Sequence, residues 1–219
     1  MSIKNSLNNI KSKLPNNVTL VAVSKTKPIP EIMEAYEAGQ RVFGENKIQE
    51  MAAKYEEMPK DIEWHMIGHI QRNKVKYMAS FVSLIHAVDS LKLLKEINKQ
   101  ALKNNRTISC LLQVKIADED SKFGLPEEDV LQLLVSEEFT SLQNIKIEGL
   151  MGMATFTNDE AQLIQEFQKL NTLYNTLKNK YNLSTLSMGM SGDYPLAITN
   201  GSNMVRVGSA IFGERNYSK

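Results

Sequence analysis

The sequence predicts a single α/β domain, a (β/α)8 TIM barrel of parallel strands, and three observations lead to that fold class. Short apolar runs alternate with helix-like stretches from Val18 onward, which is typical of a parallel sheet built from strand–helix–strand units. Several runs are unbroken rather than alternating, as expected of strands that are buried on both faces. The runs number eight within 219 residues, which favours a closed barrel over the runner-up, a doubly wound open sheet.

The eight apolar runs are the strands of the predicted barrel. They lie at residues 18–23, 40–43, 62–67, 81–86, 108–116, 145–151, 183–188 and 204–207. Helices are expected between them at residues 30–38, 47–57, 73–79, 90–103, 127–136 and 158–180. A further helix is expected within residues 1–15, because the apolar residues there form one stripe at helical spacing. No linker or repeat interrupts residues 1–219, so one domain is the expected organisation.

Residues at the predicted helix ends agree with these boundaries. Gly39 follows the helix at 30–38, in the position where a left-handed C-cap is common. Either Asp89 or Ser90 can serve as the N-cap of the helix that follows them. Pro126 precedes two glutamates at the start of another helix, where acidic side chains interact favourably with the helix dipole.

The charge balance and the cysteine content narrow the class of protein. Lys and Arg total 26 against 25 Asp and Glu, so a net charge of +1 offers little attraction for nucleic acid or anionic membranes. The single cysteine, Cys110, lies in an apolar run, which indicates a buried small hydrophobe and agrees with a reducing compartment. Because neither a signal peptide nor the ~18 apolar residues of a membrane span is found, we expect a cytoplasmic protein.

Lys25 is the first candidate for chemistry. It directly follows the first predicted strand, and functional residues of such barrels lie where the strands end at their carboxyl rim. Desolvation and neighbouring cations can lower the pKa of a lysine in that position, and the neutral amine can then condense with an aldehyde. The alternative is a lysine whose charged end simply reaches solvent from the strand end.

Two glycine-bearing turns follow the last two predicted strands. Ser191 and Gly192 precede one short helix start, and Gly208 and Ser209 precede another. Each turn would present backbone N–H groups beside a hydroxyl, an arrangement that suits a phosphate dianion. A phosphate site after strands 7 and 8 recurs in barrels, although a single glycine–serine pair is often only a turn. Together the two turns predict a phosphate site.

Arg206 is the third candidate. It lies between Val205 and Val207, so alternation along the strand aims its side chain at the opposite face. A permanently charged guanidinium that faces the lumen of a barrel requires an acceptor. The acceptor is either a ligand or a partner in a buried salt bridge, and the residues alone leave both open.

These residues lie in motifs that closely resemble the pyridoxal phosphate homeostasis proteins. The motifs are VAVSKTKP (21–28), FGENKIQE (43–50), WHMIGHIQRNK (64–74), SMGMSGD (187–193) and VRVGSAIFG (205–213). They follow the family's order, and the resemblance runs from about Val18 to Arg215. It implies a fold like the N-terminal barrel of alanine racemase and pyridoxal 5′-phosphate (PLP) as the cofactor.

The resemblance also implies which residues hold the cofactor ring. Lys25 matches the lysine that forms a Schiff base with PLP, and Arg206 matches the arginine that faces the pyridine nitrogen. Asn46 matches a residue beside the ring. His65 matches the motif as well, and it can equally be a structural histidine that packs under the ring.

The implied phosphate-binding residues are Ser191, Gly208 and Ser209. Ser209 and Asn203 stand at positions where the family often has threonine. Ser209 keeps the hydroxyl, so the departure does not weaken the expectation of phosphate binding, whereas Asn203 lies in the approach to the last strand and has no predicted effect.

The predicted site argues against efficient amino-acid turnover. Racemisation needs two bases, one on each face of the substrate, and Lys25 can serve only one face. In two-domain racemases a tyrosine of a second, all-β domain serves the other, and a chain of 219 residues is expected to lack that domain. An arginine opposite the pyridine nitrogen also weakens the ring as an electron sink. We therefore expect a protein without enzymatic function that buffers PLP or delivers it to apo-enzymes.

Two alternatives remain at this point. One is a small PLP-dependent racemase or lyase that uses one of the tyrosines as its second base. The other is a cofactor-free aldolase that acts on phosphorylated sugars through Lys25 and the same turns. Lys122, His86, Tyr36 and Tyr194 have no assigned role, and a monomer is expected because the sequence shows no evident apolar patch.

Overall fold

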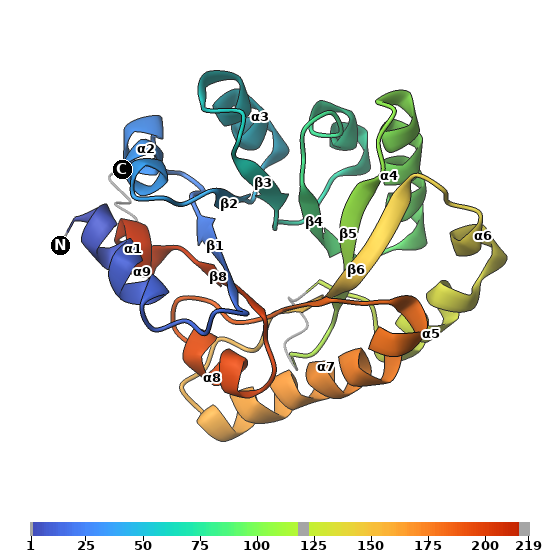
Figure 1. Cartoon of the computed structure of the whole chain (residues 1–219). Helices are drawn as coiled ribbons and strands as arrows, with labels where there is room; N and C mark the ends of the chain where they lie inside the picture. Colours follow the sequence, from blue (N-terminus) through green and yellow to red (C-terminus); the bar gives the residue numbers. More distant parts are fainter. Residues whose placement is uncertain (1, 118–122, 215–219) are drawn as a thin grey trace.

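The computed structural model describes residues 2–117 and 123–214, and its strands close into a barrel (Figure 1). The strands are β1 (Thr19–Val23), β2 (Val42–Glu45), β3 (Glu63–Met66), β4 (Leu84–Val88), β5 (Ile108–Val114), β6 (Ile145–Gly152), β7 (Thr185–Ser187) and β8 (Met204–Val207). They pair in chain order and in parallel, and β8 returns to pair with β1. The predicted (β/α)8 barrel is confirmed, and the open sheet is wrong because the first and last strands are hydrogen-bonded to each other.

Strands β2, β4 and β7 begin two or three residues later than the apolar pattern predicts, and the hydrogen bonds of the first two show why. Strand β2 begins two residues late because Gln40 connects strands through its side chain, donating from Nε2 to the carbonyls of Leu20 (2.8 Å) and Val42 (2.7 Å). Strand β4 begins three residues late because the N–H groups of residues 81–82 still bond to the carbonyl of Met78, in the preceding turn. In the runs at 40–43 and 81–86, the first residues therefore belong to the connection that precedes the strand and not to the strand itself.

The helices follow the predicted alternation. They are α1 (Ile3–Lys11), α2 (Ile29–Glu37), α3 (Ile48–Glu57), α4 (Leu91–Lys103), α5 (Glu127–Val135), α6 (Glu137–Thr140), α7 (Glu160–Tyr181), α8 (Tyr194–Thr199) and α9 (Ser209–Phe212). Where the sequence predicts an α-helix at residues 73–79, the structure has a 3-10 helix, η1 (Arg72–Tyr77). Its N–H groups bond three residues back, as from Lys74 to Gln71, and only Val75 of this helix is buried.

The helix ends agree with the predicted caps. Gly39 has a φ of 86°, the left-handed conformation that a residue following a helix adopts most easily as glycine. Of the two candidate N-caps before α4, Ser90 is the one that caps, because its Oγ accepts from the N–H of Leu93 at 3.3 Å. Pro126 is the N-cap residue of α5, with acidic residues in the first turn.

Apolar side chains fill two layers. The larger cluster lies between the strands and the surrounding helices and includes the fully buried Phe43 and Trp64. The smaller cluster consists of strand residues only and fills the barrel lumen; its buried members are Val21, Leu84, Ala87, Leu111, Met151 and Met204. Period-2 alternation along the strands explains why β1, β4, β5, β6 and β8 each contribute buried residues to both layers.

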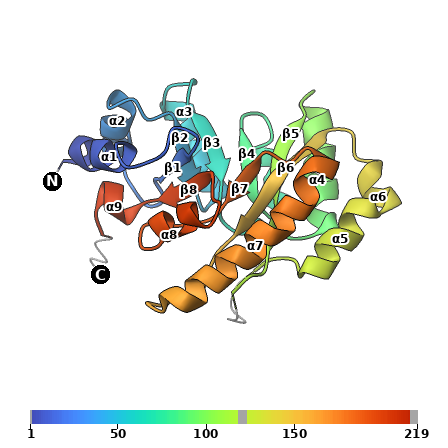
Figure 2. The same cartoon turned by 60° about the horizontal axis from the view of Figure 1, so that its bottom comes forward.

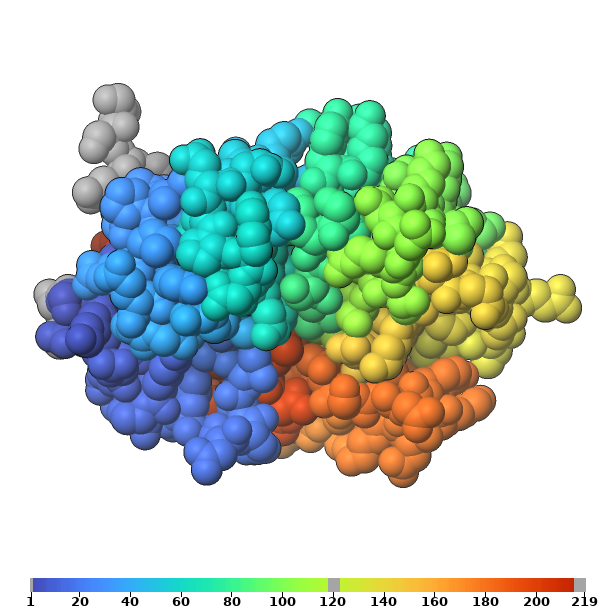
Figure 3. Space-filling view, turned by 45° about the horizontal axis from the view of Figure 1, so that its top comes forward, coloured from blue at the N-terminus to red at the C-terminus, as the bar shows by residue number. Residues whose placement is uncertain are grey.

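The helices succeed one another around the outside of the barrel in the order of the sequence. Figure 3 shows this order on the surface, from blue through cyan and green to yellow and orange. Helix α1 packs against α2 and α9, so the first and last helices lie side by side (Figures 1 and 2). Within the described ranges, no helix combines the length and hydropathy that crossing a bilayer requires.

Candidate cofactor site

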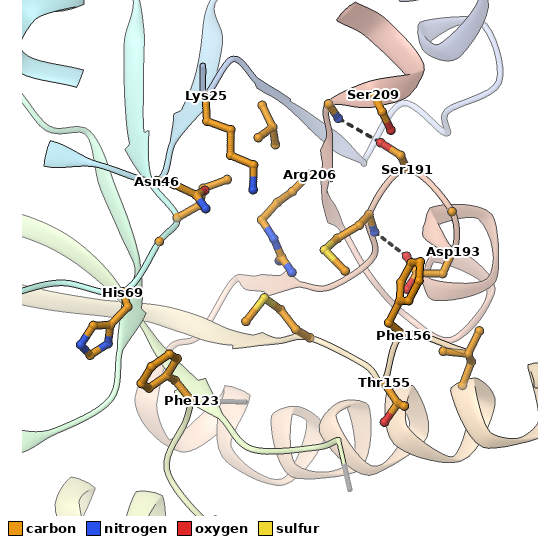
Figure 4. Close-up of a pocket in the computed structure, with 18 of the residues that line it drawn as sticks. Lys25, Asn46, His69, Phe123, Thr155, Phe156, Ser191, Asp193, Arg206 and Ser209 are labelled. Atoms are coloured by element: carbon orange, nitrogen blue, oxygen red, sulfur yellow. Dashed lines mark hydrogen bonds between the residues drawn. The ribbon is translucent and has the colours of Figure 1, made fainter. Parts of the chain in front are cut away.

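A cavity of about 810 Å³ opens at the carboxyl ends of the strands, where the sequence predicts the functional residues (Figure 4). The predicted site residues that line it are Lys25, Asn46, Ser191, Arg206, Gly208 and Ser209. His65 does not line this cavity and is buried in the barrel lumen. Residues separated by up to 184 positions in the sequence are therefore brought to one place by the closure of the barrel.

Lys25 lies two residues after the end of β1, and its side chain reaches into the cavity, as does that of Arg206 from β8 (Figure 4). The segment that carries Lys25 is held from the outer side of the barrel, between β2 and α3. There Ser24, Glu45, Glu50 and Lys54 form a hydrogen-bonded group that we call the ionic cluster.

The ionic cluster is buried and centred on a lysine. Lys54 Nζ lies 2.8 Å from Glu45 Oε1 and 2.7 Å from Glu50 Oε1, and it donates to the carbonyl of Ser24 at 2.9 Å. Ser24 Oγ donates to Glu45 Oε1 at 2.6 Å. Burial raises the pKa of the Glu45 carboxyl, and the Lys54 charge beside it opposes that rise.

The ionic cluster fixes the backbone on both sides of Lys25. On one side Lys54 holds the carbonyl of Ser24, and on the other Glu50 Oε1 accepts from the N–H of Thr26 at 2.5 Å. Thr26 has a φ of 63°, a conformation that is uncommon for a β-branched residue. The turn that presents Lys25 is thus maintained by hydrogen bonds from outside the barrel.

Asn46 lies where β2 ends, and a glycine of the next loop sets its position. A Cβ on Gly68 would lie 2.4 Å from the carbonyl oxygen of Asn46, so only glycine allows the two backbones to approach this closely. Helix α3 begins two residues after Asn46. The side chain of Asn46 is therefore held at the cavity wall by backbone packing.

The two predicted phosphate turns are joined to each other. The N–H of Gly208 donates to Ser191 Oγ at 3.1 Å, a bond drawn in Figure 4. Asp193 closes the first turn, because its Oδ1 accepts from the N–H of Met190 at 2.5 Å. Gly189 before this turn has a φ of 97°, and a Cβ there would lie 2.6 Å from that of Ala197. Two hydroxyls, of Ser191 and Ser209, thus line one wall of the cavity.

Arg206 is buried, and the described groups that it hydrogen-bonds are neutral. The Asp193 carboxylate attracts its charge from beyond ion-pair distance. One terminal nitrogen donates to Ser187 Oγ at 2.5 Å, and the other donates to the carbonyl of Gly152 at 3.0 Å. Burial lowers the pKa of the guanidinium to about 10, so it keeps its charge at neutral pH. Among the described residues no carboxylate lies within ion-pair distance of Arg206. The salt-bridge alternative therefore gains no support from this part of the chain.

Two histidines continue the polar contacts of Arg206 through the lumen. His86 Nδ1 lies 3.1 Å from Ser187 Oγ, and His86 Nε2 lies 3.0 Å from His65 Nδ1. Burial lowers the pKa of His65 to about 3 and that of His86 well below its usual value. We call Arg206, Ser187, His86 and His65 the lumen row. Within it His65 is separated from Arg206 by two side chains.

Sequence reasoning missed several residues of the site. His69 and Phe123 line the cavity with their rings stacked 4.3 Å apart, and His69 Nδ1 lies 3.2 Å from Asp89 Oδ2. Ser187 was not singled out although it lies in the motif SMGMSGD, and His86 had no role although it lies in a strand. The period-2 pattern places both side chains in the lumen, and that signal was available in the sequence.

Other candidate residues lie away from the cavity or outside the description. Tyr36 donates to Asp61 Oδ1 at 2.8 Å, and neither Tyr36 nor Tyr194 is among the residues that line the cavity. Cys110 is buried, as predicted, and burial raises the pKa of its thiol. Lys122 lies outside the described residues.

Comparison with known proteins gives a consistent picture at the level of sequence. The model of the alanine racemase N-terminal domain matches residues 1–216. The pyridoxal phosphate homeostasis protein of Vibrio alginolyticus is 42% identical over 212 residues, which cover 94% of this chain and 90% of that protein. The protein of the same name from Aquifex aeolicus is 41% identical over 206 residues, covering 92% and 89%.

Solved structures agree with the sequence comparison. PipY of Synechococcus elongatus superposes with a TM-score of 0.90 without PLP and 0.88 with PLP bound, at 37% and 36% identity. Both comparisons cover 96% of this chain and all of PipY. Alanine racemase of Clostridium difficile superposes with a TM-score of 0.82 at 14% identity, covering 99% of this chain and 61% of the racemase, which shows a shared fold.

Proposed function

This chain belongs to the alanine racemase N-terminal domain family and, within it, to the pyridoxal phosphate homeostasis proteins, and we propose that it binds PLP covalently through Lys25. The neutral Lys25 amine adds to the aldehyde carbon of PLP, and one water leaves as the Schiff base forms. The protein then stores the cofactor or delivers it to apo-enzymes, and it keeps the concentration of free aldehyde low.

One arrangement carries this proposal. An amine, a guanidinium with no carboxylate at ion-pair distance among the described residues, and two joined hydroxyl-bearing turns face a single cavity (Figure 4). They come from the connection after β1, from β8, and from the connections after β7 and β8. A phosphorylated aromatic aldehyde offers a complementary group to each of them: an aldehyde to Lys25, a ring nitrogen to Arg206, and a dianion to Ser191 and Ser209. The PLP-bound structure of PipY supports the choice of ligand.

The composition of the cavity supports holding rather than turnover. No tyrosine lines it within the described parts of the chain, so the tyrosine that the racemase alternative would use as its second base has no candidate there. Arg206 keeps a positive charge where a ring nitrogen would lie, and a cation disfavours protonation of that nitrogen. Bound PLP would supply an aldehyde and an electron-withdrawing ring. Arg206 would weaken the electron withdrawal by the ring.

Covalent binding is tested by reduction with borohydride. The purified protein is incubated with PLP, reduced, digested and analysed by mass spectrometry, and the visible absorbance band is recorded before reduction. We expect the modified peptide to contain Lys25, and Lys25→Ala to lose both the adduct and the band. Lys47→Ala removes an exposed lysine that lies two residues after the end of the neighbouring strand β2, and it serves as the matched control. An adduct at another lysine would contradict the assignment.

The homeostasis role is tested separately from binding. The PLP-loaded protein is incubated with single enantiomers of amino acids, and in a second experiment with an apo-enzyme whose activity reports transfer. We expect negligible racemisation and a recovery of apo-enzyme activity. Robust turnover that depends on Lys25 would favour the racemase or lyase alternative and leave the binding proposal intact.

A further inference from the structure

The lumen row crosses the barrel as a chain of hydrogen bonds from four strands. It starts at Arg206 on β8, passes through Ser187 on β7 and His86 on β4, and ends at His65 on β3. The three distances are 2.5, 3.1 and 3.0 Å, and the exposed fraction of each side chain is at most 4%. Four polar side chains in a lumen that is otherwise filled by apolar strand residues call for a physical reason.

The direction of donation along the row follows from the chemistry of its first member. A guanidinium has no lone pair to offer, so Arg206 donates to Ser187 Oγ. The Ser187 hydroxyl retains one proton, and the remaining described partner of that oxygen is His86 Nδ1. Ser187 therefore donates to Nδ1, which makes His86 the Nε2–H tautomer.

The same reasoning determines the last member. His86 Nε2–H donates to His65 Nδ1, so His65 is also the Nε2–H tautomer. If the row ran the other way, Ser187 would receive two donors and its own proton would have no acceptor among the described residues. The lowered pKa of both histidines agrees with neutral rings that accept on one side and donate on the other.

The row uses only part of the Arg206 guanidinium. Of its five N–H groups, one bonds Ser187 and one bonds the carbonyl of Gly152. Because these two acceptors lie on different strands, the planar group cannot rotate without breaking a bond. The rest of the guanidinium lines the cavity, where Figure 4 shows it at the centre of the drawn side chains.

We propose that Ser187, His86 and His65 are positioning residues for Arg206. They hold the guanidinium in one orientation, so that its unused N–H groups face a ligand atom that accepts a hydrogen bond, such as an aromatic ring nitrogen. Because the three are neutral, they do not offset the charge of Arg206. This inference rests on the proposed function for the identity of the ligand, while the row itself is a property of the protein without PLP.

The first test concerns the row alone and needs no ligand. Nitrogen-15 NMR of the histidine rings in wild-type protein without PLP reports which ring nitrogen carries the proton. We expect the Nε2–H form for both His86 and His65 at neutral pH. An Nδ1–H or doubly protonated His86 would overturn the inference whether or not the protein binds PLP.

The second test asks whether the row acts on the ligand. Arg206→Gln removes the expected contact between the guanidinium and the pyridine nitrogen of PLP. The change that it causes in the absorbance spectrum of bound PLP is the reference for the other variants. Ser187→Ala and His86→Leu break the row, and we expect them to reproduce that spectral change in part and to weaken PLP binding about tenfold. Borohydride trapping at Lys25 should persist in all three, which separates a failure of positioning from a failure of binding.

A rescue variant and a control complete the design. The amide of His86→Asn can still accept from Ser187, so its spectrum should return toward wild type while that of His86→Leu does not. Ser202→Ala removes another buried hydroxyl, one whose described partners are backbone groups near β7 and β8, and should leave the spectrum unchanged. If all these variants lose stability but keep the wild-type spectrum and affinity, the row is only lumen packing and the inference is wrong.

Discussion

Two buried cations of this protein are held in opposite ways. Lys54, between β2 and α3, lies within 2.8 Å of two carboxylates, those of Glu45 and Glu50. Arg206, in the lumen, donates hydrogen bonds to a hydroxyl and a carbonyl. In the described part of the chain no carboxylate lies within ion-pair distance of it. Both side chains belong to hydrogen-bonded groups of similar size, so the difference lies in the charge of their partners.

The difference separates a structural role from a binding role. A buried charge is costly unless a counter-charge and hydrogen bonds compensate for it. The ionic cluster supplies the counter-charge internally and leaves one carboxylate oxygen, Glu45 Oε2, without a hydrogen bond among the described residues. Its effect is to hold the backbone around Lys25. The lumen row meets it only in part, because hydrogen bonds engage two of the five N–H groups of the guanidinium and no carboxylate of the described residues lies at ion-pair distance. The largest expected effects therefore fall on stability in one group and on ligand binding in the other.

Breaking the ionic cluster should have the largest effect on stability. Lys54→Met leaves the carboxylate of Glu45 buried without its cation, and we expect the free energy of unfolding to fall by about 3–5 kcal/mol in chemical denaturation. Lys95→Met makes the same change in the exposed pair with Glu138, whose N–O distance is 2.7 Å, and should cost at most about 0.5 kcal/mol. Equal losses in the two variants would contradict the assignment of the ionic cluster as an anchor.

The histidines of the lumen row should make stability depend on pH. Their pKa values are lowered in the folded state, so below pH 6.5 the unfolded chain binds protons that the folded chain does not. For His65, whose pKa is lowered to about 3, this difference persists down to that pH. The contribution of the neutral histidines to the free energy of unfolding is fully present above pH 6.5 and is lost as the pH falls below that value. For two such histidines we expect the free energy of unfolding, measured by chemical denaturation, to fall by about 3 kcal/mol between pH 7.5 and 5.5. His86→Asn should remove about half of this dependence, and an unchanged slope would argue against a neutral, buried His86.

The phosphate turns should affect ligand affinity more than stability. Ser191→Ala removes a hydroxyl that is expected to bond the dianion, and PLP binding should weaken by about 1–3 kcal/mol in an equilibrium titration. Ser141→Ala, at an exposed serine that bonds only a backbone carbonyl among the described residues, is the control. Unchanged affinity in Ser191→Ala would move the phosphate site away from these turns.

The smallest effect on stability should come from Arg206. Arg206→Met loses two hydrogen bonds but also removes a buried charge without a carboxylate partner, and these changes oppose each other. We expect the free energy of unfolding without PLP to stay within about 1 kcal/mol of the wild-type value, while PLP binding is weakened. A loss as large as that of Lys54→Met would mean that the charge of Arg206 is compensated within the protein, and the comparison would fail.

The barrel was predictable because its determinants are local and repeat along the chain. Unbroken apolar runs and helix ends such as Gly39 and Ser90 are read from a few neighbouring residues, and both recur with each strand–helix unit. The errors lie where local pattern is ambiguous. The late start of β4 and the 3-10 helix η1 depend on how a connection packs, which an apolar run alone does not reveal.

By itself, the sequence determined the fold class and placed six polar or glycine residues at the cavity, because strand ends and period-2 alternation specify rim and lumen positions. It did not determine what the charged groups bond to. His65 was expected beside the cofactor, and the closure of the barrel instead joins it through His86 and Ser187 to Arg206. The pairing of Lys54 with Glu45 likewise depends on how α3 packs against β2. Only the tertiary structure decides such contacts, since a hydrogen bond depends on distances of a few tenths of an ångström between residues that lie far apart in the chain.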